Sequence, residues 1–343
     1  MSRWRKAAQN LAAELERQFD SRRLRFEPSP GKRIIVPYRG FGRPEELLVS
    51  GRVLEEKLIT RATEAEPVWR NLLNAYRRFE SDEVAGARVR ATFGRLTAEA
   101  VTDEEGHFQL RIAPEELDSA ARWHEVLLQL EGEETRYPAH VMVPPSHAEM
   151  MVISDIDDTI VQTGATSLWT MMETTFLRNA AMRVPFEGVS NFYAALIRDR
   201  NPIFYVSSSP WNLYELLSDF LKINDIPHGP MLLQDFGIGD EKLIHAPHDV
   251  HKVEKIRLVL DYYPDLPAVL IGDSGQRDPE IYLQIIQAYP ARIRAAFIRD
   301  VTPDVRDQAV ARIIGQAAEA GVEMLYVPDS ASALDHARRI GLI

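Results

Sequence analysis

Three aspartates lie within four positions of the sequence, at Asp155, Asp157 and Asp158. The apolar residues 150–153 come just before them, and such a run predicts a buried β-strand. Like charges at this spacing repel one another, and burying each of them costs free energy. A solvated loop would tolerate the cluster, whereas a cluster at the end of a buried strand needs a cation or a chemical role.

Polar residues also follow two later apolar runs. Ser207–Ser209 come after the run 203–206, and Asp273 and Asp278 come after the run 268–271. If these runs are parallel strands of one sheet, their carboxyl ends meet at the same edge, where ligands bind. The sequence therefore predicts that carboxylates and hydroxyls distant in the chain converge there.

Phosphoryl transfer is the chemistry that suits such a set. An oxygen-rich site without cysteine favours a hard cation such as Mg²⁺, and a carboxylate can act as a nucleophile. Hydroxyls and free N–H groups at a helix start can hold phosphate oxygens. Lys252 or Lys255 could neutralise the phosphate and the nucleophile, and because they are three positions apart on a predicted helix, both could face the site.

The aspartates and serines have other possible roles, of which a calcium-binding EF-hand is excluded and helix capping remains open. An EF-hand starting at Asp155 would need Gly at its sixth position and Glu at its twelfth, but Ile160 and Thr166 stand there. The serines could instead cap a helix that begins at Pro210, which is compatible with phosphate binding.

Three further residues near this edge allow two readings. Asp278, just before Pro279, could cap the following helix. Arg277 and Arg299 could reach a substrate, but each could equally be an ordinary surface arginine.

The elements that must position these residues alternate along the second half of the chain. Strands are expected at 150–153, 203–206, 268–271, 295–298 and 323–327, with helices at 211–222, 252–262, 279–288 and 304–319. This alternation is typical of an α/β fold, with a parallel sheet covered by helices on both faces.

The first half contains mainly short alternating strands. They are expected at 33–37, 47–54, 87–93, 107–112, 124–130 and 137–143, with one helix at 67–79. Many short strands without a regular strand–helix–strand alternation favour an antiparallel β-sandwich, immunoglobulin- or transthyretin-like. We therefore expect a β-sandwich domain at 28–145 and a catalytic domain at 146–343.

Residues 1–27 predict an amphipathic helix with Trp4, Leu11, Leu15 and Phe19 on one face. Its seven basic and four acidic residues give it a charge of +3, in a chain of net charge −11. The apolar stripe could contact a membrane through residues 2–20, or could pack on the protein itself.

The composition excludes several classes of protein. The net charge of −11 argues against nucleic acid as a partner, and the absence of cysteine excludes disulfides and thiol catalysis. We see no transmembrane run and no signal-peptide core, so we expect a cytoplasmic protein, with peripheral membrane contact as a possibility.

The motifs resemble those of a known family. D-I-D-D-T at 155–159 is similar to the D-x-D-x-T motif of haloacid-dehalogenase-type phosphatases, and G-D-S-G-Q-R-D at 272–278 is similar to their last motif. The stretches 206–214, 251–256 and 272–282 resemble the actin-patch-type phosphatidate phosphatases, which are distant relatives of the lipins. Within that family, the chain resembles a bacterial-type member. The resemblance implies a Rossmann-like catalytic domain with a small cap.

The resemblance also implies roles for individual residues. Asp155 would be the nucleophile and Asp157 the general acid. The Mg²⁺ site would be formed by Asp155, the backbone carbonyl of Asp157 and Asp273, with Asp278 nearby. Ser207 would hydrogen-bond a phosphate oxygen, and the remaining phosphate-binding positions would be Thr159, Ser208 and Ser209. The catalytic lysine would be Lys252 or Lys255, and the resemblance does not choose between them.

The insert between Gly164 and Pro185 is too short for a large cap domain. An open site suits a phosphate on a bulky molecule, and the resemblance favours a membrane lipid. Apolar residues of the insert could face that lipid or pack internally: Trp169, Met171, Met172 and Phe176.

We therefore expect Mg²⁺-dependent hydrolysis of phosphatidate to diacylglycerol and phosphate, through an aspartyl-phosphate. The alternatives are a phosphatase for a protein or a small soluble phosphomonoester, and an inactive phosphatase fold that serves as a binding module.

Overall fold

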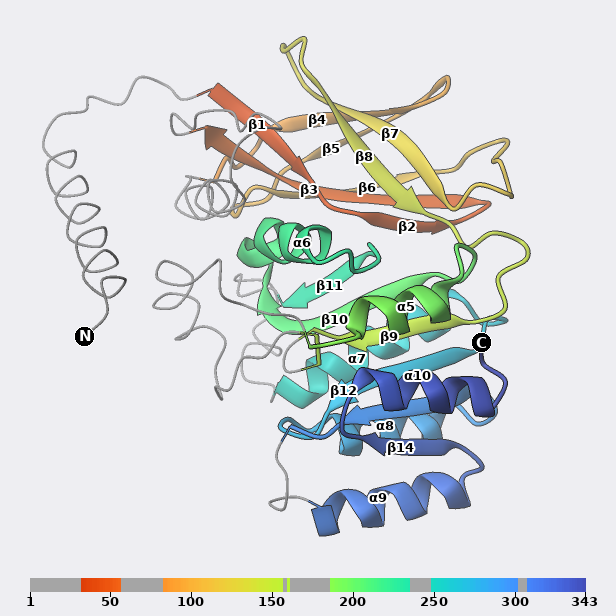
Figure 1. Cartoon of the computed structure of the whole chain (residues 1–343). Coiled ribbons are helices and arrows are strands. Elements are labelled where there is room, and N and C mark those ends of the chain that lie inside the picture. The colour runs from red at the N-terminus through yellow and green to blue at the C-terminus, as the bar shows by residue number, and fades with distance from the viewer. Residues whose placement is uncertain (1–31, 57–82, 157–158, 161–185, 235–247, 302–306) are drawn as a thin grey trace, which may run out of the picture.

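The computed structural model describes residues 32–56, 83–156, 159–160, 186–234, 248–301 and 307–343. They form two sheets with helices around the second one (Figure 1). Several expectations fall outside the described residues: the helix at 1–27, the helix at 67–79, Asp157, Asp158 and the apolar residues of the insert.

The second sheet has six strands, and each of its strand pairs is parallel. The strand order is β11-β10-β9-β12-β13-β14, so the chain winds outwards from β9 first on one side and then on the other. The strands are β9 (Met151–Asp155), β10 (Ile203–Pro210), β11 (Met231–Gln234), β12 (Ala268–Asp273), β13 (Ile293–Arg299) and β14 (Glu323–Val327).

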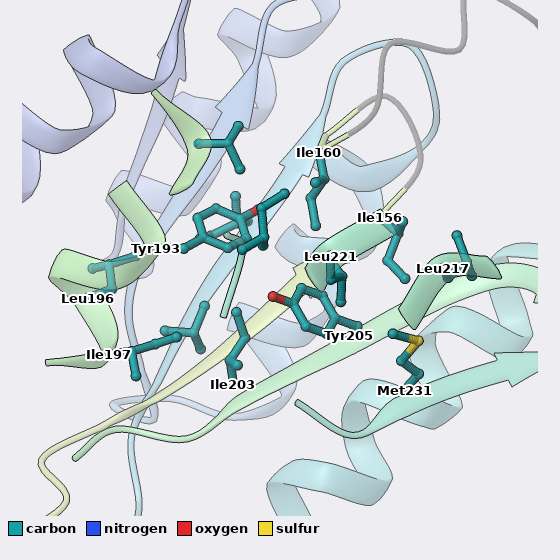
Figure 2. Packing of buried hydrophobic residues seen from close by; sticks show 14 of the residues in the cluster. Ile156, Ile160, Tyr193, Leu196, Ile197, Ile203, Tyr205, Leu217, Leu221 and Met231 are labelled. Carbon is teal, nitrogen blue, oxygen red and sulfur yellow. The ribbon is translucent and has the colours of Figure 1, made fainter. Parts of the chain in front are cut away.

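Helices cover both faces of this sheet because its strands are apolar on both sides. Val152 and Tyr205 pack towards one layer of helices, and their neighbours Ile153 and Phe204 pack towards the other. Figure 2 shows part of the first layer, where Tyr193 and Leu221 pack near Tyr205. The first layer contains α5 (Val189–Ile197), α6 (Tyr214–Ile223) and α10 (Ser330–Arg339), and the second contains α7 (His248–Tyr262), α8 (Asp278–Ala288) and α9 (Asp307–Glu319).

The α/β prediction is confirmed, but three elements were missed. Strand β11 has only four residues, too few to show a pattern. Helix α5 is apolar around most of its circumference, and its N-cap Gly188 makes no side-chain cap hydrogen bond. Helix α10 contains few large apolar residues, although Asp329 caps it by accepting a 2.7 Å hydrogen bond from the N–H of Ser332.

The N-terminal sheet has eight strands and is antiparallel except for one pair. Strands β2 and β8 are parallel, which differs from the expected pattern. The strands are β1 (Lys32–Pro37), β2 (Gly40–Arg43), β3 (Glu46–Glu56), β4 (Arg88–Phe93), β5 (Leu96–Val101), β6 (His107–Ile112), β7 (Trp123–Leu130) and β8 (Arg136–Met142).

Strands β2 and β5 were not predicted. Strand β2 is short and rich in glycine, and Gly40 is needed because a Cβ there would lie 2.1 Å from the carbonyl oxygen of Leu48. Strand β5 is only partly buried along its length, so its hydrophobic alternation is weak. The predicted division of the chain into domains at residue 145 stays a prediction; residues 143–150 connect β8 to β9.

The N-terminal sheet contacts the α/β part through aromatic packing and hydrogen bonds. Tyr38 stacks on Trp211 with ring centroids 4.6 Å apart, and the Tyr263 hydroxyl donates a 2.9 Å hydrogen bond to the carbonyl of Gly42. The guanidinium of Arg52 donates to Asn212 Oδ1 at 2.7 Å. The N-terminal sheet thus lies over α6 and β11 (Figure 1) and contacts the turn that follows β10.

Candidate functional site

Asp155 is the last residue of β9, and only 1% of its surface is exposed. The ammonium of Lys252, which comes from α7, lies 2.8 Å from Asp155 Oδ1 and also contacts the carboxylate of Asp278. The Thr159 hydroxyl donates a 3.3 Å hydrogen bond to Asp155 Oδ2. A buried carboxylate at a strand end is thus held between an ammonium and a hydroxyl.

Asp273 ends β12, beside β9 in the sheet. Its Oδ1 accepts hydrogen bonds from the N–H groups of Gly275 and Gln276, at 2.6 and 2.9 Å. Its own N–H donates to Asp278 Oδ2 at 3.1 Å. These bonds fold the six residues from Asp273 to Asp278 into a loop that presents both carboxylates to Asp155.

Gly272 is a feature of this site that the sequence reasoning missed. A Cβ at this position would lie 2.2 Å from Asp278 Oδ2, so any other residue would displace that carboxylate. The G-D pair that opens the last motif was the available signal.

Each of the carboxylates of Asp155, Asp273 and Asp278 offers an oxygen within 4.8 Å of the others, and all three residues are buried. Among the described residues, the ammonium of Lys252 contacts Asp155 and Asp278, and the buried guanidinium of Arg299 attracts the charge of Asp273, so the carboxylates outnumber the cations. Buried charges of one sign are costly unless they are neutralised. The donor set, all carboxylate oxygen, fits a divalent hard cation such as Mg²⁺.

The surroundings of Lys252 keep it charged. Burial alone would lower the pKa of its ammonium, but the charges of Asp155 and Asp278 outweigh burial and raise the pKa well above its ordinary value. Lys252 is therefore protonated throughout the neutral pH range and acts as a fixed positive charge.

The other candidate lysine occupies a different position. The ammonium of Lys255 donates a 3.0 Å hydrogen bond to the backbone carbonyl of Ser207. The structure thus brings Lys252 to the carboxylates and Lys255 to the serine strand end.

The serines lie where predicted, but not as a helix cap. Strand β10 continues to Pro210, and the following 3₁₀ turn, Trp211–Leu213, begins after it without a side-chain cap hydrogen bond. The expectation that a helix begins at Pro210 is wrong. Instead, the Ser207 hydroxyl oxygen accepts a 2.9 Å hydrogen bond from the N–H of Ser209, which tightens the strand end.

Two alternatives for neighbouring residues are also resolved. Asp278 is the first residue of α8 and not its N-cap, which is Arg277; its carboxylate faces Lys252 and the Asp273 backbone. Arg299 is 8% exposed, hydrogen-bonds to Ser330, and lies 4.0 Å from the ring centroid of Phe186. Burial lowers the pKa of Arg299, which packs inside the fold and is not a surface arginine.

Two hydroxyls behind Asp155 were not predicted. The Ser154 hydroxyl donates a 2.7 Å hydrogen bond to the Asp155 carbonyl and lies 2.7 Å from the hydroxyl of Tyr193. Burial raises the pKa of Tyr193 well above its ordinary value, so it remains a neutral phenol. Because Tyr193 lies on α5, which the sequence pattern did not reveal, only the polar Ser154 within an apolar run could have drawn attention.

Among the described residues, no helix is both long and apolar enough to cross a bilayer.

Comparisons with known proteins concern the part of the chain that carries this site. Residues 150–300 match the family model of the catalytic domain of phosphatidate phosphatase APP1. The chain is 31% identical over 174 residues to phosphatidate phosphatase APP1 of Saccharomyces cerevisiae, covering 50% of this chain and 29% of that protein. It is 31% identical over 182 residues to an uncharacterized protein of Schizosaccharomyces pombe, covering 52% and 30%.

Among solved structures, the chain resembles a carbohydrate acetylesterase from Xanthomonas citri with 11% identity and a TM-score of 0.37, over 90% of this chain and 73% of that one. A likeness at this level carries no argument about fold or function. The chain spans less than a third of the length of the two curated yeast relatives. The family match and these relatives support a phosphatase domain at residues 150–300, of a phosphatidate phosphatase-like family.

Proposed function

We propose that this chain is a Mg²⁺-dependent phosphatidate phosphatase that works through an aspartyl-phosphate on Asp155. The observation that carries the proposal is the buried cluster of Asp155, Lys252, Asp273 and Asp278, which lies within the segment that matches the catalytic-domain model. A phosphate bound there would meet a carboxylate nucleophile, a fixed ammonium and a cation site together.

The carboxylates of Asp155, Asp273 and Asp278 would hold Mg²⁺, with the backbone carbonyl of Asp157 as a further ligand, which leaves the Asp157 side chain for proton transfer. When bound, Mg²⁺ supplies positive charge that balances the cluster and the phosphoryl oxygens. Three buried carboxylates that gather their oxygens within 4.8 Å, more than the cations beside them in the described part of the chain, support a divalent ion.

In the proposed reaction, the Asp155 carboxylate attacks phosphorus, and the bond from phosphorus to the glycerol oxygen breaks. Asp157 gives its proton to the leaving oxygen of diacylglycerol. Asp157 then takes a proton from water, which attacks phosphorus, releases inorganic phosphate and restores the carboxylate of Asp155. Lys252 holds positive charge beside the nucleophile throughout.

We also propose that the serine strand end binds phosphate oxygens through Ser207, Ser208 and Ser209, together with Thr159, whose hydroxyl donates to Asp155 Oδ2. The bond from Lys255 to the Ser207 carbonyl would hold this strand end in place. On this assignment Lys252 is the catalytic lysine, and Lys255 is a positioning residue.

The same arrangement supports placing the α/β part in the haloacid dehalogenase superfamily, with a Rossmann-like sheet. Its strand order, with β9 at the centre where the winding reverses, is that of doubly wound folds that bind ligands at this point.

Access to a lipid substrate would come through peripheral membrane contact by residues 2–20. Their net positive charge would attract anionic vesicles, and salt would weaken that attraction. Deleting residues 2–20 should lower binding to phosphatidate-containing vesicles at low salt while the melting temperature stays the same. A fall of several degrees in melting temperature with unchanged vesicle binding would contradict membrane contact.

The proposed function is tested by release of inorganic phosphate from phosphatidate in mixed micelles. We expect turnover with Mg²⁺, none in excess chelator, and a loss of at least about 10⁴-fold in Asp155→Asn. Asp265→Asn is the matched control, because Asp265 is exposed and precedes the start of β12, whereas the site residue Asp273 lies at the other end of that strand. Hydrolysis of soluble phosphomonoesters without hydrolysis of phosphatidate would favour the alternative substrate class, and full activity of Asp155→Asn would exclude the mechanism.

A further inference from the structure

A half-open cleft of about 780 Å³ lies between the N-terminal sheet and the α/β part. A volume of this size is in the range of sites for small organic ligands. Its lining is rich in apolar side chains from both parts, among them Tyr38, Phe41, Leu48, Trp211, Leu232 and Leu258.

Two of these apolar side chains are unusually exposed. Val101 and Leu258 are 53% and 52% exposed, and both line the cleft. They come from β5 and α7, in different parts of the molecule, yet they open onto the same hollow. Exposed apolar surface that gathers in a concavity marks a binding site more often than apolar residues scattered singly.

The cleft adjoins the catalytic centre. Lys255 lines it, and the ammonium of Lys255 is hydrogen-bonded to the carbonyl of Ser207. Trp211 also lines it and follows the serine strand end directly in the chain. The cleft therefore begins one side chain away from the proposed phosphate-binding strand end.

The walls of the cleft are held together by direct bonds. Tyr38 stacks on Trp211, and Arg52 connects the turn at Asn212 to the carbonyl of Glu105 and the carboxylate of Glu83. A site whose walls are fixed before binding loses less entropy when a ligand enters. The interface is thus built to keep a cavity open beside the active site.

The charged residues around the cleft determine which way an amphiphilic ligand would lie in it. Lys255 and Arg39 contribute positive charge, the latter while its guanidinium donates to Ser218, whereas the turn Asp103–Glu105 contributes three carboxylates. An anionic headgroup is favoured beside the lysine and repelled by the acidic turn. An amphiphile with one phosphate end would therefore lie with its phosphate at the catalytic centre and its apolar chain along the cleft.

We propose that this cleft, at the junction of the two sheets, binds one acyl chain of the phosphatidate substrate, an inference that rests on the function proposed above. The N-terminal sheet then contributes directly to substrate recognition, since Tyr38, Phe41 and Val101 form part of the wall. The phosphate is bound by the α/β part and the chain by both parts.

Substrate chain length provides a kinetic test. Monoacylglycerol phosphates with chains of about six to twelve carbons, kept below their critical micelle concentrations, should show kcat/KM rising by up to roughly fourfold per methylene. The double variant Val101→Asn/Leu258→Gln should flatten this slope at least severalfold. Ile223→Gln, which replaces another exposed apolar residue outside the cleft lining, should keep the wild-type slope.

A binding test separates this inference from the proposed reaction. Alkylphosphonates of increasing chain length cannot be hydrolysed, and calorimetry on the full chain should show Kd falling with chain length and a negative heat-capacity change. This chain dependence should weaken in the double variant, whether or not the protein hydrolyses phosphatidate. A protein that hydrolyses phosphatidate but shows no chain dependence, or the same dependence in the double variant, would overturn the acyl-chain site and leave the cleft for another occupant, such as a polypeptide segment.

Discussion

Charged side chains are buried in two regions of this molecule, and the regions differ in how their charges are balanced. At the edge of the parallel sheet, three carboxylates face the ammonium of Lys252 and, at Asp273, the charge of Arg299, among the residues that the structure describes. At the junction of the two sheets, Arg52 is 6% exposed and donates to Glu83, Asn212 and the carbonyl of Glu105. At the junction one cation is surrounded by acceptors, whereas at the sheet edge the described carboxylates outnumber the described cations.

This difference separates function from stability. A site that must bind a cation and a phosphate retains unbalanced charge in its free state, and that charge costs stability. A structural junction has no such requirement, so its buried arginine can be fully hydrogen-bonded. Substitutions at the sheet edge should therefore change activity more than stability, and substitutions at the junction should do the reverse.

The strongest contrast is expected for Asp273→Asn. Asparagine can keep accepting the N–H bonds of Gly275 and Gln276, so the loop should survive while one repelling charge disappears. We expect kcat/KM to fall by at least about 10³-fold, with a melting temperature without metal equal to or above that of the wild type. Mg²⁺ should raise the melting temperature of the wild type and not that of the variant. A variant destabilised without metal by more than about 1 kcal/mol would contradict unbalanced charge at this edge.

The next largest loss of activity is expected at the two lysines of α7, which allow a matched comparison. Lys252→Met removes the ammonium that contacts both Asp155 and Asp278, and should lower kcat/KM by about 10²- to 10³-fold. Lys255→Met removes a hydrogen bond to a backbone carbonyl and should cost about tenfold. Steady-state kinetics on one short-chain substrate measures kcat/KM of both variants and so shows which lysine is catalytic. A larger loss in Lys255→Met would reverse our assignment.

At the junction, Arg52→Ala should destabilise the fold by about 2–4 kcal/mol, because three acceptors lose their donor together. Chemical denaturation measures this change. Arg90→Ala is the matched control: its ion pair with Glu99 is exposed, and its loss should cost less than about 1 kcal/mol. Equal effects of the two substitutions would show that the junction contributes no more than the surface does.

The smallest effect is expected on the stability of the fold at low pH, through His228. Burial and the positive charges of Arg39 and Lys222 lower the pKa of His228, beside the junction, to about 4. The unfolded chain binds this proton near pH 6.5, so the folded state loses stability as the pH falls from 6.5 towards 4. His228→Asn should reduce the drop in melting temperature between pH 7 and pH 5 slightly, and exposed His147→Asn should not. An unchanged drop in His228→Asn would exclude this contribution.

The sheet edge was more predictable than the junction, for a physical reason. Each strand of the edge is a continuous apolar run followed by polar residues, so β9, β10 and β12 and the positions of Asp155, Ser207 and Asp273 were expected from local sequence. The choice between Lys252 and Lys255 was not, because it depends on how α7 is rotated against the sheet.

The junction could not be predicted because no local pattern encodes it. Arg52 lies within a strand of alternating residues, and its partner Asn212 is 160 positions away. Tyr193 was missed with α5, whose nearly uniform hydrophobicity hides its helical period. Contacts between distant elements depend on the packing of the whole chain.

The central claim is that Asp155 becomes phosphorylated during turnover. The most direct measurement is to quench the reaction with phosphatidate and Mg²⁺, reduce any acyl-phosphate with borohydride, and map the product by peptide mass spectrometry. We predict homoserine at position 155, formed only with substrate and Mg²⁺ and absent from Asp155→Asn. Turnover at the full rate with position 155 unmodified, or with homoserine at another acidic residue, would contradict the account.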